Sequence, residues 1–362
     1  MRIAQLAPTY ERVPPRGYGG IELIVHLVTE ELVRRGHDVT LYATGDSETS
    51  ARLSSVIPWP YRYGADDQGV RHAEYPHLAN VQAAFADAAE GRYDLIHNHA
   101  GLEGVVLAAW SDTPVLTTTH GAWTPEALAA WDRYPWRHHQ VSANQAATNP
   151  AHGRLAPVHH GIDLSRFRPR ISRSSAESPL VFLGRFAPAK GPEVAIDVAR
   201  RTRRPLLMAG KVDGGDREWF ERDVAPLVDG ERIRIVGEVG RAGKAELLAC
   251  AAALLFPIVW DEPFGLVVVE ALASGTPVVA FRRGSVPELI DDGVTGFLVD
   301  DADAMADAVG RVDRLDRAAC RLTAERRFSV ERMVDDLQSR YEETIALGPN
   351  EPIVGRVYAR IG

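Results

Sequence analysis

The sequence predicts an α/β protein built from two Rossmann-like, doubly wound parallel-sheet domains that face a central cleft. The chain has 362 residues, which exceeds the usual size of one domain. Short apolar segments alternate with segments of helical periodicity in both halves, as expected for parallel strands joined by helices. The segment 168–179 is rich in serine and arginine and indicates a linker between the two series.

The first series begins with a strand at 2–7, a long loop and a helix at 21–35. Apolar residues recur in this helix at the spacing of one helical face, and Gly36 ends it. The later elements are a strand at 38–42, a helix at 78–89, a strand at 94–97, a helix at 105–110 and a strand at 114–118. Such alternation is typical of a parallel sheet.

The second series repeats this alternation after the linker. Its elements are a strand at 180–183, a helix at 194–201, a strand at 205–209, a helix at 219–227, a strand at 233–236, a helix at 244–252, a strand at 252–258 and a helix at 266–273. A last helix is expected at 330–347. We place the domains at 1–165 and 166–329, and expect the C-terminal helix, about 330–362, to return to the first domain.

The composition is that of an ordinary soluble globular protein, with 45% hydrophobic and 25% charged residues. The net charge of -8 argues against nucleic acid as a partner. Cys250 and Cys320 lack metal-binding spacing and fit a reducing compartment. No signal peptide is evident, and the longest apolar run, 249–260, is far shorter than a transmembrane helix. We expect a cytoplasmic protein without a transmembrane segment, for which peripheral membrane contact stays open.

Two glutamates, Glu262 and Glu270, bracket a turn and the first turns of a helix. Glu262 follows a buried-looking strand, and Gly265 and Leu266 lie at the expected helix N-terminus, where N–H groups and the helix dipole suit an anion. Carboxylates beside an anion site suit the hydroxyl groups of a sugar and a ribose, so the arrangement favours a nucleotide-sugar ligand. The alternative is that both glutamates only complement the helix dipole.

A loop with two cations follows the strand at 180–183. Arg185 comes directly after Gly184, and Lys190 precedes a Gly-Pro pair that starts the next helix. Arginine as a planar fork and lysine as a compact charge could together hold a diphosphate. Only three of the 41 basic residues are lysines: Lys190, Lys211 and Lys244. The alternative is that these are solvated loop charges.

The first half contributes a histidine, a glycine-rich loop and a His-x-His pair. His120 follows the strand at 114–118 and should project from its carboxyl end. Gly19 and Gly20 precede the helix at 21–35, where backbone could approach a ligand closely. His97 and His99 could suggest a metal, as could the pairs His138-His139 and His159-His160, but no carboxylate cluster accompanies them. We therefore expect no metal site there, only cleft lining or structure.

Taken together, these motifs resemble the retaining glycosyltransferases of family 4, which have the GT-B fold, over nearly the whole chain. The matching segments are Gly184-Arg185 with Lys190-Gly191, Glu262 to Glu270, 273–279, 284–288, 292–297, Thr119-His120-Gly121 and 160–163 followed by Phe167 and Pro169. The ordered set is far more specific than any single member.

The resemblance implies a site, a reaction and a role for each domain. Arg185 and Lys190 would hold the donor diphosphate, Glu262 the sugar hydroxyls and Glu270 the ribose. His120 would contact the sugar, and the backbone N–H groups of the helix start, Phe264 to Leu266, would contact sugar and phosphate. The first domain would be on the acceptor side, with Tyr18, Gly19 and Gly20 in its cleft loop, and the second would bind the donor.

The implied reaction moves a hexosyl group from a nucleoside-diphosphate sugar to an acceptor hydroxyl with retention, without metal or cofactor. Uridine is favoured as the base by its frequency in the family. Front-face displacement needs no covalent glutamate, so a two-carboxylate hydrolase scheme does not apply.

Alternative functions stay open at this point. A dinucleotide-dependent oxidoreductase is disfavoured because the Gly-x-Gly-x-x-Gly fingerprint is absent after the first strand. A non-catalytic nucleotide-sugar-binding protein, or a phosphorylase or hydrolase on the same fold, is less well excluded. The acceptor is unidentified, and the aromatic residues Tyr18, Trp123, Trp131 and Trp136 are candidates for its platform.

Overall fold

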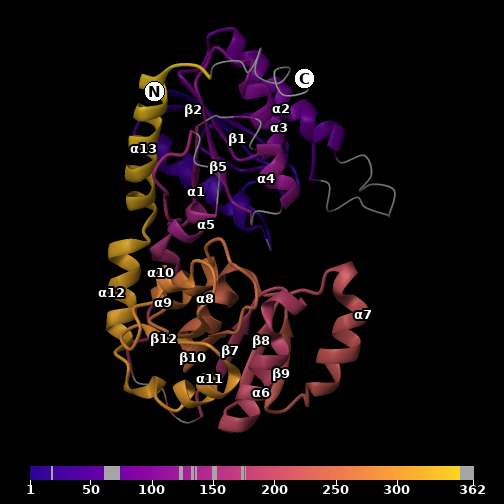
Figure 1. The fold of residues 1–362 in the computed structure, drawn as a ribbon, viewed down its shortest axis with the longest axis vertical. Helices are drawn as coiled ribbons and strands as arrows, with labels where there is room; N and C mark the ends of the chain where they lie inside the picture. Colours follow the sequence, from indigo (N-terminus) through magenta and orange to yellow (C-terminus); the bar gives the residue numbers. More distant parts are fainter. Residues whose placement is uncertain are drawn as a thin grey trace, which may run out of the picture. The chain divides into compact units, whose positions relative to one another are not determined.

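The computed structural model describes residues 1–17, 19–60, 74–121, 125–131, 134, 137–148, 153–172, 175 and 177–350. The chain forms two compact units (Figure 1). Unit 1 comprises Met1–Gly161 and Val330–Gly362, and unit 2 comprises Ile162–Ser329. Each unit contains one six-stranded parallel sheet with helices. The predicted α/β fold with two doubly wound sheets is therefore confirmed.

Unit 1 alternates strands and helices, and its last helix comes from the end of the chain. Its elements are β1 (Arg2–Leu6), α1 (Gly20–Arg34), β2 (Asp38–Tyr42), β3 (Arg52–Ser54), α2 (Glu74–Ala89), β4 (Leu95–Asn98), α3 (Leu102–Ala108), β5 (Val115–Thr119), α4 (Pro125–Trp131), β6 (His138–Gln140), α5 (Ala143–Ala147) and α13 (Val330–Leu347). The strand order is β3-β2-β1-β4-β5-β6. The order reverses between β1 and β4, and ligands of such sheets bind beyond the carboxyl ends of these two strands.

Unit 2 repeats the same topology with different residues. Its strands and α-helices are β7 (Leu180–Leu183), α6 (Pro192–Thr202), β8 (Leu206–Ala209), α7 (Arg217–Trp219), β9 (Ile233–Gly237), α8 (Arg241–Cys250), β10 (Ala253–Phe256), α9 (Leu266–Ala273), β11 (Val278–Phe281), α10 (Val286–Leu289), β12 (Gly296–Val299), α11 (Ala302–Val309) and α12 (Arg317–Arg327). The strand order is β12-β11-β10-β7-β8-β9. When the strands of each unit are numbered from its own first strand, this is the order of unit 1 read from the opposite edge of the sheet. The reversal lies between β7 and β10.

Apolar side chains hold each sheet to its helices. In unit 2, Leu180 and Phe182 of β7 pack with Ile196 of α6 and Met305 of α11 in one cluster. Leu180 and Phe182 are two residues apart, so they lie on the same face of the strand. Burial of each such side chain contributes roughly 1.5–3 kcal/mol relative to exposure. The helices are therefore fixed on the sheet, and the loops beyond the strand ends are left to carry polar residues.

Most element positions agree with those expected from periodicity, and the differences have local causes. The helix expected at 244–252 spans Arg241–Cys250 instead, and it ends there because Ala251 has an extended backbone just before β10. The helix expected at 219–227 is a succession of short α, π and 3-10 turns from Arg217 to Leu227, and Pro226 lies in the last of them. Four strands of the structure were not predicted from the sequence: β3, β6, β11 and β12.

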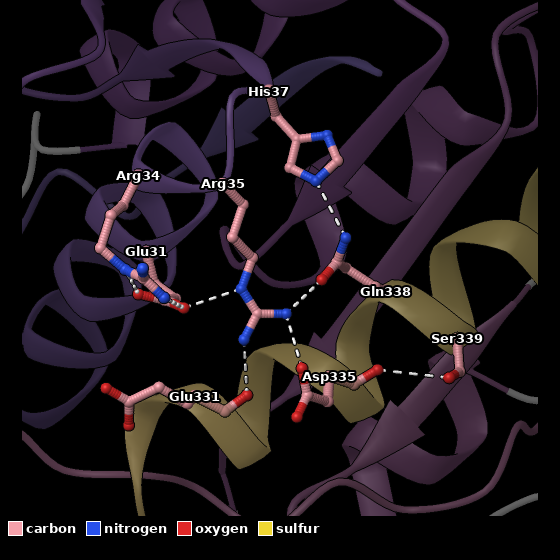
Figure 2. Close-up of polar contacts among 8 residues, drawn as sticks. All are labelled: Glu31, Arg34, Arg35, His37, Glu331, Asp335, Gln338 and Ser339. Carbon is pink, nitrogen blue, oxygen red and sulfur yellow. Dashed lines mark hydrogen bonds and ion pairs between the residues drawn. The ribbon is translucent and has the colours of Figure 1, made fainter.

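The C-terminal helix α13 packs against α1 within unit 1 (Figure 2). Arg35, at the end of α1, donates to Glu31 at 2.7 Å and to Asp335 of α13 at 2.7 Å. The same guanidinium donates to the backbone carbonyl of Glu331 at 2.9 Å and to the side chain of Gln338. One arginine therefore ties three residues of α13 to the first helix of the unit.

Candidate functional site

A loop with a left-handed glycine follows β7, at the strand-order reversal of unit 2. The 3-10 turn Pro188–Lys190 leads to Gly191, whose φ of 64° is left-handed. A Cβ atom at Gly191 would lie 2.3 Å from the carbonyl oxygen of Pro257, in the segment after β10. The amide of Val259 donates to the carbonyl of Ala189 at 3.0 Å. The Lys190 loop is thus held directly against the segment that leads to Glu262.

Lys190 and Glu262 form an ion pair at this reversal point. The Lys190 Nζ atom lies 2.6 Å from Glu262 Oε2, and both side chains are largely buried. The indole N–H of Trp260 donates to the same carboxylate oxygen at 3.1 Å. Lys190 Nζ also lies 4.9 Å from the centroid of the Trp260 ring. The predicted cation and carboxylate are therefore brought together, with an aromatic ring beside both.

Backbone contacts from a neighbouring loop fix the Glu262 segment. A Cβ atom at Gly284 would lie 2.4 Å from the Glu262 backbone nitrogen, and its φ of 53° is left-handed. Ser285 donates its amide to the Glu262 carbonyl at 3.0 Å and its hydroxyl to the Phe264 carbonyl at 2.7 Å. Gly265, with a φ of 91°, then begins α9 as its N-cap. Phe264, Gly265 and Leu266 lie at the helix N-terminus that the sequence predicts.

Glu270, in the second turn of α9, pairs with a lysine from another helix. Its side chain is buried, with 3% of the residue exposed. Lys244 Nζ of α8 forms an ion pair with Glu270 Oε1. The carboxylate is therefore held in a fixed orientation and is compensated by a cation.

Arg185, directly after Gly184, takes part in a third charged cluster. It donates to Asp213 at 2.9 Å, and Lys211 Nζ lies 2.9 Å from the other oxygen of the same carboxylate. Burial acts to raise the pKa of Asp213, but the hydrogen bonds from Lys211 and Arg185 outweigh it and lower this pKa. Arg185 and Lys190 lie on the same loop, so unit 2 carries two positive side chains beyond the end of β7.

All three lysines of the chain thus pair with carboxylates on segments that follow strands of one sheet. Sequence reasoning named Glu262, Glu270, Lys190 and Arg185 but gave no role to the remaining members: Trp260, Lys211, Asp213 and Lys244. The rarity of lysine was the available signal, because it marks Lys211 and Lys244 as exceptions in an arginine-rich chain.

In unit 1, His120 follows β5 directly and is bonded through both ring nitrogens. Its Nε2 atom lies 2.8 Å from Nδ1 of His99, and its Nδ1 atom lies 3.3 Å from Nε2 of His160. Burial, with a contribution from His139, lowers the pKa of His120 to about 3. His120 is therefore neutral at physiological pH and acts as a hydrogen-bonding group, not as a cation.

The histidines that resemble metal ligands in the sequence lie around His120. His97, His99 and His160 are buried, and burial lowers the pKa of each well below its usual value. They bond to one another, to His120 and to neighbouring polar groups. Among the described residues, no group of histidine, cysteine and carboxylate side chains has an arrangement that could hold a metal ion.

The glycine-rich loop of unit 1 leads into α1. Gly19 is the N-cap, and a Cβ atom there would lie 2.6 Å from Cβ of Pro15 and 3.1 Å from Oε2 of Glu22. Gly20 is the first residue of the helix. Tyr18, Trp123 and Trp136 lie outside the described residues, and Trp131 ends α4 with its ring centroid 6.2 Å from that of His138.

Two parallel sheets of equal strand order, each in its own unit, are the architecture of the GT-B fold. Sucrose-phosphate synthase from Thermosynechococcus elongatus has this fold and superposes with a TM-score of 0.78 at 22% identity, covering 96% of this chain and 100% of that one. A protein from Anabaena, solved in complex with UDP and glucose, superposes with a TM-score of 0.70 at 20% identity, covering 94% and 99%.

The chain belongs to glycosyltransferase family 4 and is a glycosyltransferase. Residues 18–166 match the family described as Glycosyltransferase Family 4, and residues 177–313 match Glycosyl transferases group 1. The D-inositol 3-phosphate glycosyltransferase of Mycolicibacterium smegmatis is 30% identical over 381 aligned positions, covering 91% of this chain and 87% of that protein. The resemblance inferred from the sequence motifs is therefore confirmed.

No described helix is both long enough and apolar enough to cross a membrane. Both cysteines are free thiols; Cys250 is exposed and Cys320 is buried.

Proposed function

We propose that the protein transfers a hexosyl group from a nucleoside-diphosphate sugar to an acceptor hydroxyl with retention of anomeric configuration. Unit 2 is the donor domain and unit 1 the acceptor-side domain. The observation that carries the proposal is the Lys190–Glu262 pair beside Trp260, at the reversal point of the unit 2 sheet. It combines a cation for phosphate with a carboxylate for sugar hydroxyls next to a helix N-terminus.

Arg185 and Lys190 hold the diphosphate of the donor. Lys190 has three N–H donors, of which one is directed to Glu262, so that two are left for phosphate oxygens. Arg185 offers a planar fork from the same loop. As the bond to the sugar breaks, negative charge grows on the diphosphate, and positioned cations stabilise that charge most strongly in a site that excludes water. The reaction then needs no metal ion and no further cofactor.

Glu262 holds the sugar through its second carboxylate oxygen. Lys190 and Trp260 both contact Oε2, which leaves Oε1 as an acceptor for sugar hydroxyls. The backbone N–H groups of Phe264, Gly265 and Leu266 contribute donors to sugar and phosphate. His120 contacts the sugar from unit 1, and Gly19 and Gly20, together with Tyr18, border the acceptor.

Glu270 holds the ribose of the nucleotide. Lys244 contacts its Oε1 atom and fixes the plane of the carboxylate, so that Oε2 can accept hydrogen bonds from ribose hydroxyls. UDP is the favoured nucleotide, because a protein of the same fold is solved with UDP and glucose. The free thiols of Cys250 and Cys320 are in keeping with the cytoplasmic location that we propose.

An inositol phosphate is the first acceptor to test, because several relatives carry the name D-inositol 3-phosphate glycosyltransferase. Two further candidate functions use the same site: binding of a nucleotide sugar without transfer, and a phosphorylase or hydrolase reaction. Retention follows from front-face displacement, in which neither Glu262 nor Glu270 forms a bond to the sugar.

The proposal is tested in two stages. A thermal-shift screen of UDP, ADP, GDP and their sugars identifies the nucleotide, since a ligand that binds only the folded state raises Tm. The selected donor is then incubated with D-inositol 3-phosphate, and the anomeric configuration of the product is read by NMR, with and without EDTA. A product of retained configuration formed in EDTA supports the proposal, and a product of inverted configuration contradicts it; donor binding without turnover excludes D-inositol 3-phosphate as the acceptor.

A further inference from the structure

A continuous chain of hydrogen-bonded polar side chains lies behind His120 in unit 1. It crosses four neighbouring strands through Gln5 of β1, His97 of β4, Thr118 of β5 and His139 of β6, all of them buried. Gln5 is paired with His97 across the sheet, and Thr118 is paired with His139. The register partner of His97 in β5 is Leu116, and Thr118 lies two residues further along that strand, so its hydroxyl reaches His97 diagonally across the sheet.

At one end of this hydrogen-bonded network, a backbone carbonyl fixes the tautomer of His139. Nδ1 of His139 lies 3.2 Å from the backbone carbonyl of Gln140, which can only accept, so Nδ1 carries the proton. Nε2 of His139 is then an acceptor for the Thr118 hydroxyl, 2.7 Å away. Because that hydroxyl has one proton, its oxygen accepts from Nε2–H of His97, also at 2.7 Å. His97 therefore has a bare Nδ1.

The same logic continues from His97 to His120. Nε2 of His99 lies 3.2 Å from the bare Nδ1 of His97, so it must be the protonated nitrogen of His99. Its Nδ1 is then bare and accepts from Nε2–H of His120 at 2.8 Å. His120 is left with a bare Nδ1, to which Nε2–H of His160 donates over a longer distance of 3.3 Å.

Two further contacts agree with this assignment. The hydroxyl of Tyr341, from α13, lies 2.7 Å from the bare Nδ1 of His97 and donates to its lone pair, so that the main acceptor for Nε2–H of His99 is the Gln5 amide oxygen. The same hydroxyl accepts from the amide of Gln5 at 3.1 Å, and the amide oxygen of Gln5 lies 3.2 Å from Nε2–H of His99. Burial lowers the pKa of His97, His99, His120 and His160 and so keeps these rings neutral, and with neutral rings this set of tautomers gives each of these contacts one donor and one acceptor.

We infer that His99 is a positioning residue that holds His120 as its Nε2–H tautomer, so that Nδ1 of His120 is the atom that accepts a hydrogen bond from a hydroxyl of the donor sugar. This inference rests on the proposed contact between His120 and the sugar. The weaker contact of Nδ1, to His160, is the one that a sugar hydroxyl replaces. In the other tautomer, Nδ1–H would face the hydroxyl and could not accept from it.

A purely structural role would also explain a satisfied buried network, and the two readings differ in one observable. If the network is purely structural, the tautomer of His120 does not depend on His99. If His99 positions His120, the tautomer of His120 changes when the acceptor, Nδ1 of His99, is removed. Asparagine and leucine have nearly the same shape, but only asparagine can present an oxygen close to the position of the His99 Nδ1 atom. The pair His99→Asn and His99→Leu therefore separates the hydrogen bond from the packing.

The test is NMR of the full chain labelled with ¹⁵N-histidine, which reports which ring nitrogen carries the proton without any substrate. The His120 signals are assigned by their loss in His120→Asn. We expect Nε2–H for His120 in the wild-type chain and in His99→Asn, and a mixture of tautomers in His99→Leu. An Nδ1–H tautomer in the wild-type chain overturns the inference, as does an unchanged tautomer in folded His99→Leu. If His99→Leu does not fold, His99→Ala, which also removes the Nδ1 acceptor, takes its place, and an unchanged Nε2–H tautomer of His120 in that variant overturns the inference.

Turnover gives the second readout, with UDP-glucose as the first donor tested. We expect His99→Leu to lose about 10-fold or more in kcat and His99→Asn to recover most of the loss, by analogy with other groups that orient a histidine. His77→Leu is the matched control. His77 is also buried, but it bonds to Thr9 and Ala100, which are not part of the hydrogen-bonded network around His120. Equal losses in His99→Leu and His77→Leu overturn the inference. If the wild-type chain binds no nucleotide sugar, the proposed function and the sugar contact of His120 fail together, whereas the spectra still show whether His99 sets the tautomer of His120.

Discussion

The two sheets of the protein have the same strand order, but the polar groups beyond their strands are of opposite kinds. All 12 histidines of the chain lie before residue 162, in unit 1, and all three lysines lie in unit 2. Unit 1 has a network of neutral rings around His120, whereas unit 2 has ion pairs at Lys190, Lys244 and Arg185. One topology therefore supports two kinds of polar chemistry, decided by the residues on its loops.

The difference corresponds to the two parts of the proposed donor. A diphosphate carries full negative charge and calls for cations, which unit 2 provides with each cation already compensated by a carboxylate. A sugar carries hydroxyls, and a neutral histidine of defined tautomer can select between donating and accepting toward them. We therefore expect unit 2 to supply the charged groups that bind the donor, and unit 1 to supply neutral groups that donate or accept hydrogen bonds. The following variants test this difference between the units.

The largest effect is expected for Glu262→Gln. This change keeps the size of the side chain but removes the charge that pairs with Lys190 and accepts from Trp260. We expect kcat to fall about 100- to 1000-fold, the range found for loss of one well-placed polar group at a reacting centre. Steady-state kinetics with the selected donor measures it.

Asp197→Asn is the control for this variant. Asp197 is a half-exposed carboxylate of unit 2 that pairs with Arg201 at 2.9 Å on α6. Its kcat should stay within about twofold of the wild-type value, because exposed ion pairs contribute little. Equal activity of the two folded variants would show that Glu262 has no special role.

Acid should weaken unit 1 more than unit 2. Burial lowers the pKa of His120 to about 3 and that of His139 to about 4, below the unfolded value of about 6.5. Between these values the unfolded chain binds more protons, so stability is complete above pH 6.5 and falls as the pH falls. By pH 5 each of these histidines removes about 2 kcal/mol from the stability of unit 1.

Hydrogen exchange at pH 7 and pH 5, corrected for intrinsic rates, measures this difference. Amides of β5 and β6 should lose protection relative to those of β10 and β11, because unit 2 contains no histidine. The lowered pKa of Asp213 stabilises unit 2 at pH values above its usual range, and this contribution is lost only at still lower pH. Equal loss of protection in both sheets would contradict the contrast between the units.

The fold and half of the charged site could be predicted from the sequence because both depend on local patterns. Helical periodicity fixed α9 and α13 to the residue, and strand ends placed Glu262, Lys190 and His120 on loops. Two short strands, β3 and β6, were missed because three residues are too few to show alternation. The expected bounds of α8 failed because apolar residues continue from the helix into β10.

The remaining site residues depend on contacts that sequence spacing does not contain. Lys244 meets Glu270 across 26 positions, and Asp213 joins Arg185 across 28. The histidines were seen as isolated pairs, since only the strand register places His97, His139 and His120 in one network. The available signal was a set of polar residues near the carboxyl ends of neighbouring strands, and it can be interpreted only when the strand order and register are known.

Lys244→Met sharpens the assignment within unit 2. Without its ammonium group, the buried Glu270 carboxylate loses its partner and its orientation toward the ribose. We expect KM for the donor to rise about 10-fold with kcat nearly unchanged, as for loss of a charge-assisted contact to a part of the ligand that does not react. Lys211→Met, which removes the ammonium group that pairs with Asp213, should change KM less; the reverse order would assign the nucleotide to the Lys211 side.

Tyr341→Phe should have the smallest effect, and it acts on unit 1 alone. It removes the hydroxyl that donates to His97 and accepts from Gln5, while the ring stays in the core. We expect a loss of about 1 kcal/mol in the free energy of unfolding, with Glu262 and its partners unaffected. Denaturant unfolding measures the loss, and a change in UDP affinity would contradict the separation of the two units.

Calorimetric titration of UDP into the wild-type chain, Lys190→Met and Arg201→Met tests the central claim most directly. Arg201 is a half-exposed cation of the same unit, on the helix that follows Lys190. We predict that Lys190→Met raises Kd about 10-fold or more while Arg201→Met leaves it within about twofold. Equal affinity of both folded variants, or absence of wild-type binding to UDP, ADP and GDP alike, would contradict the account.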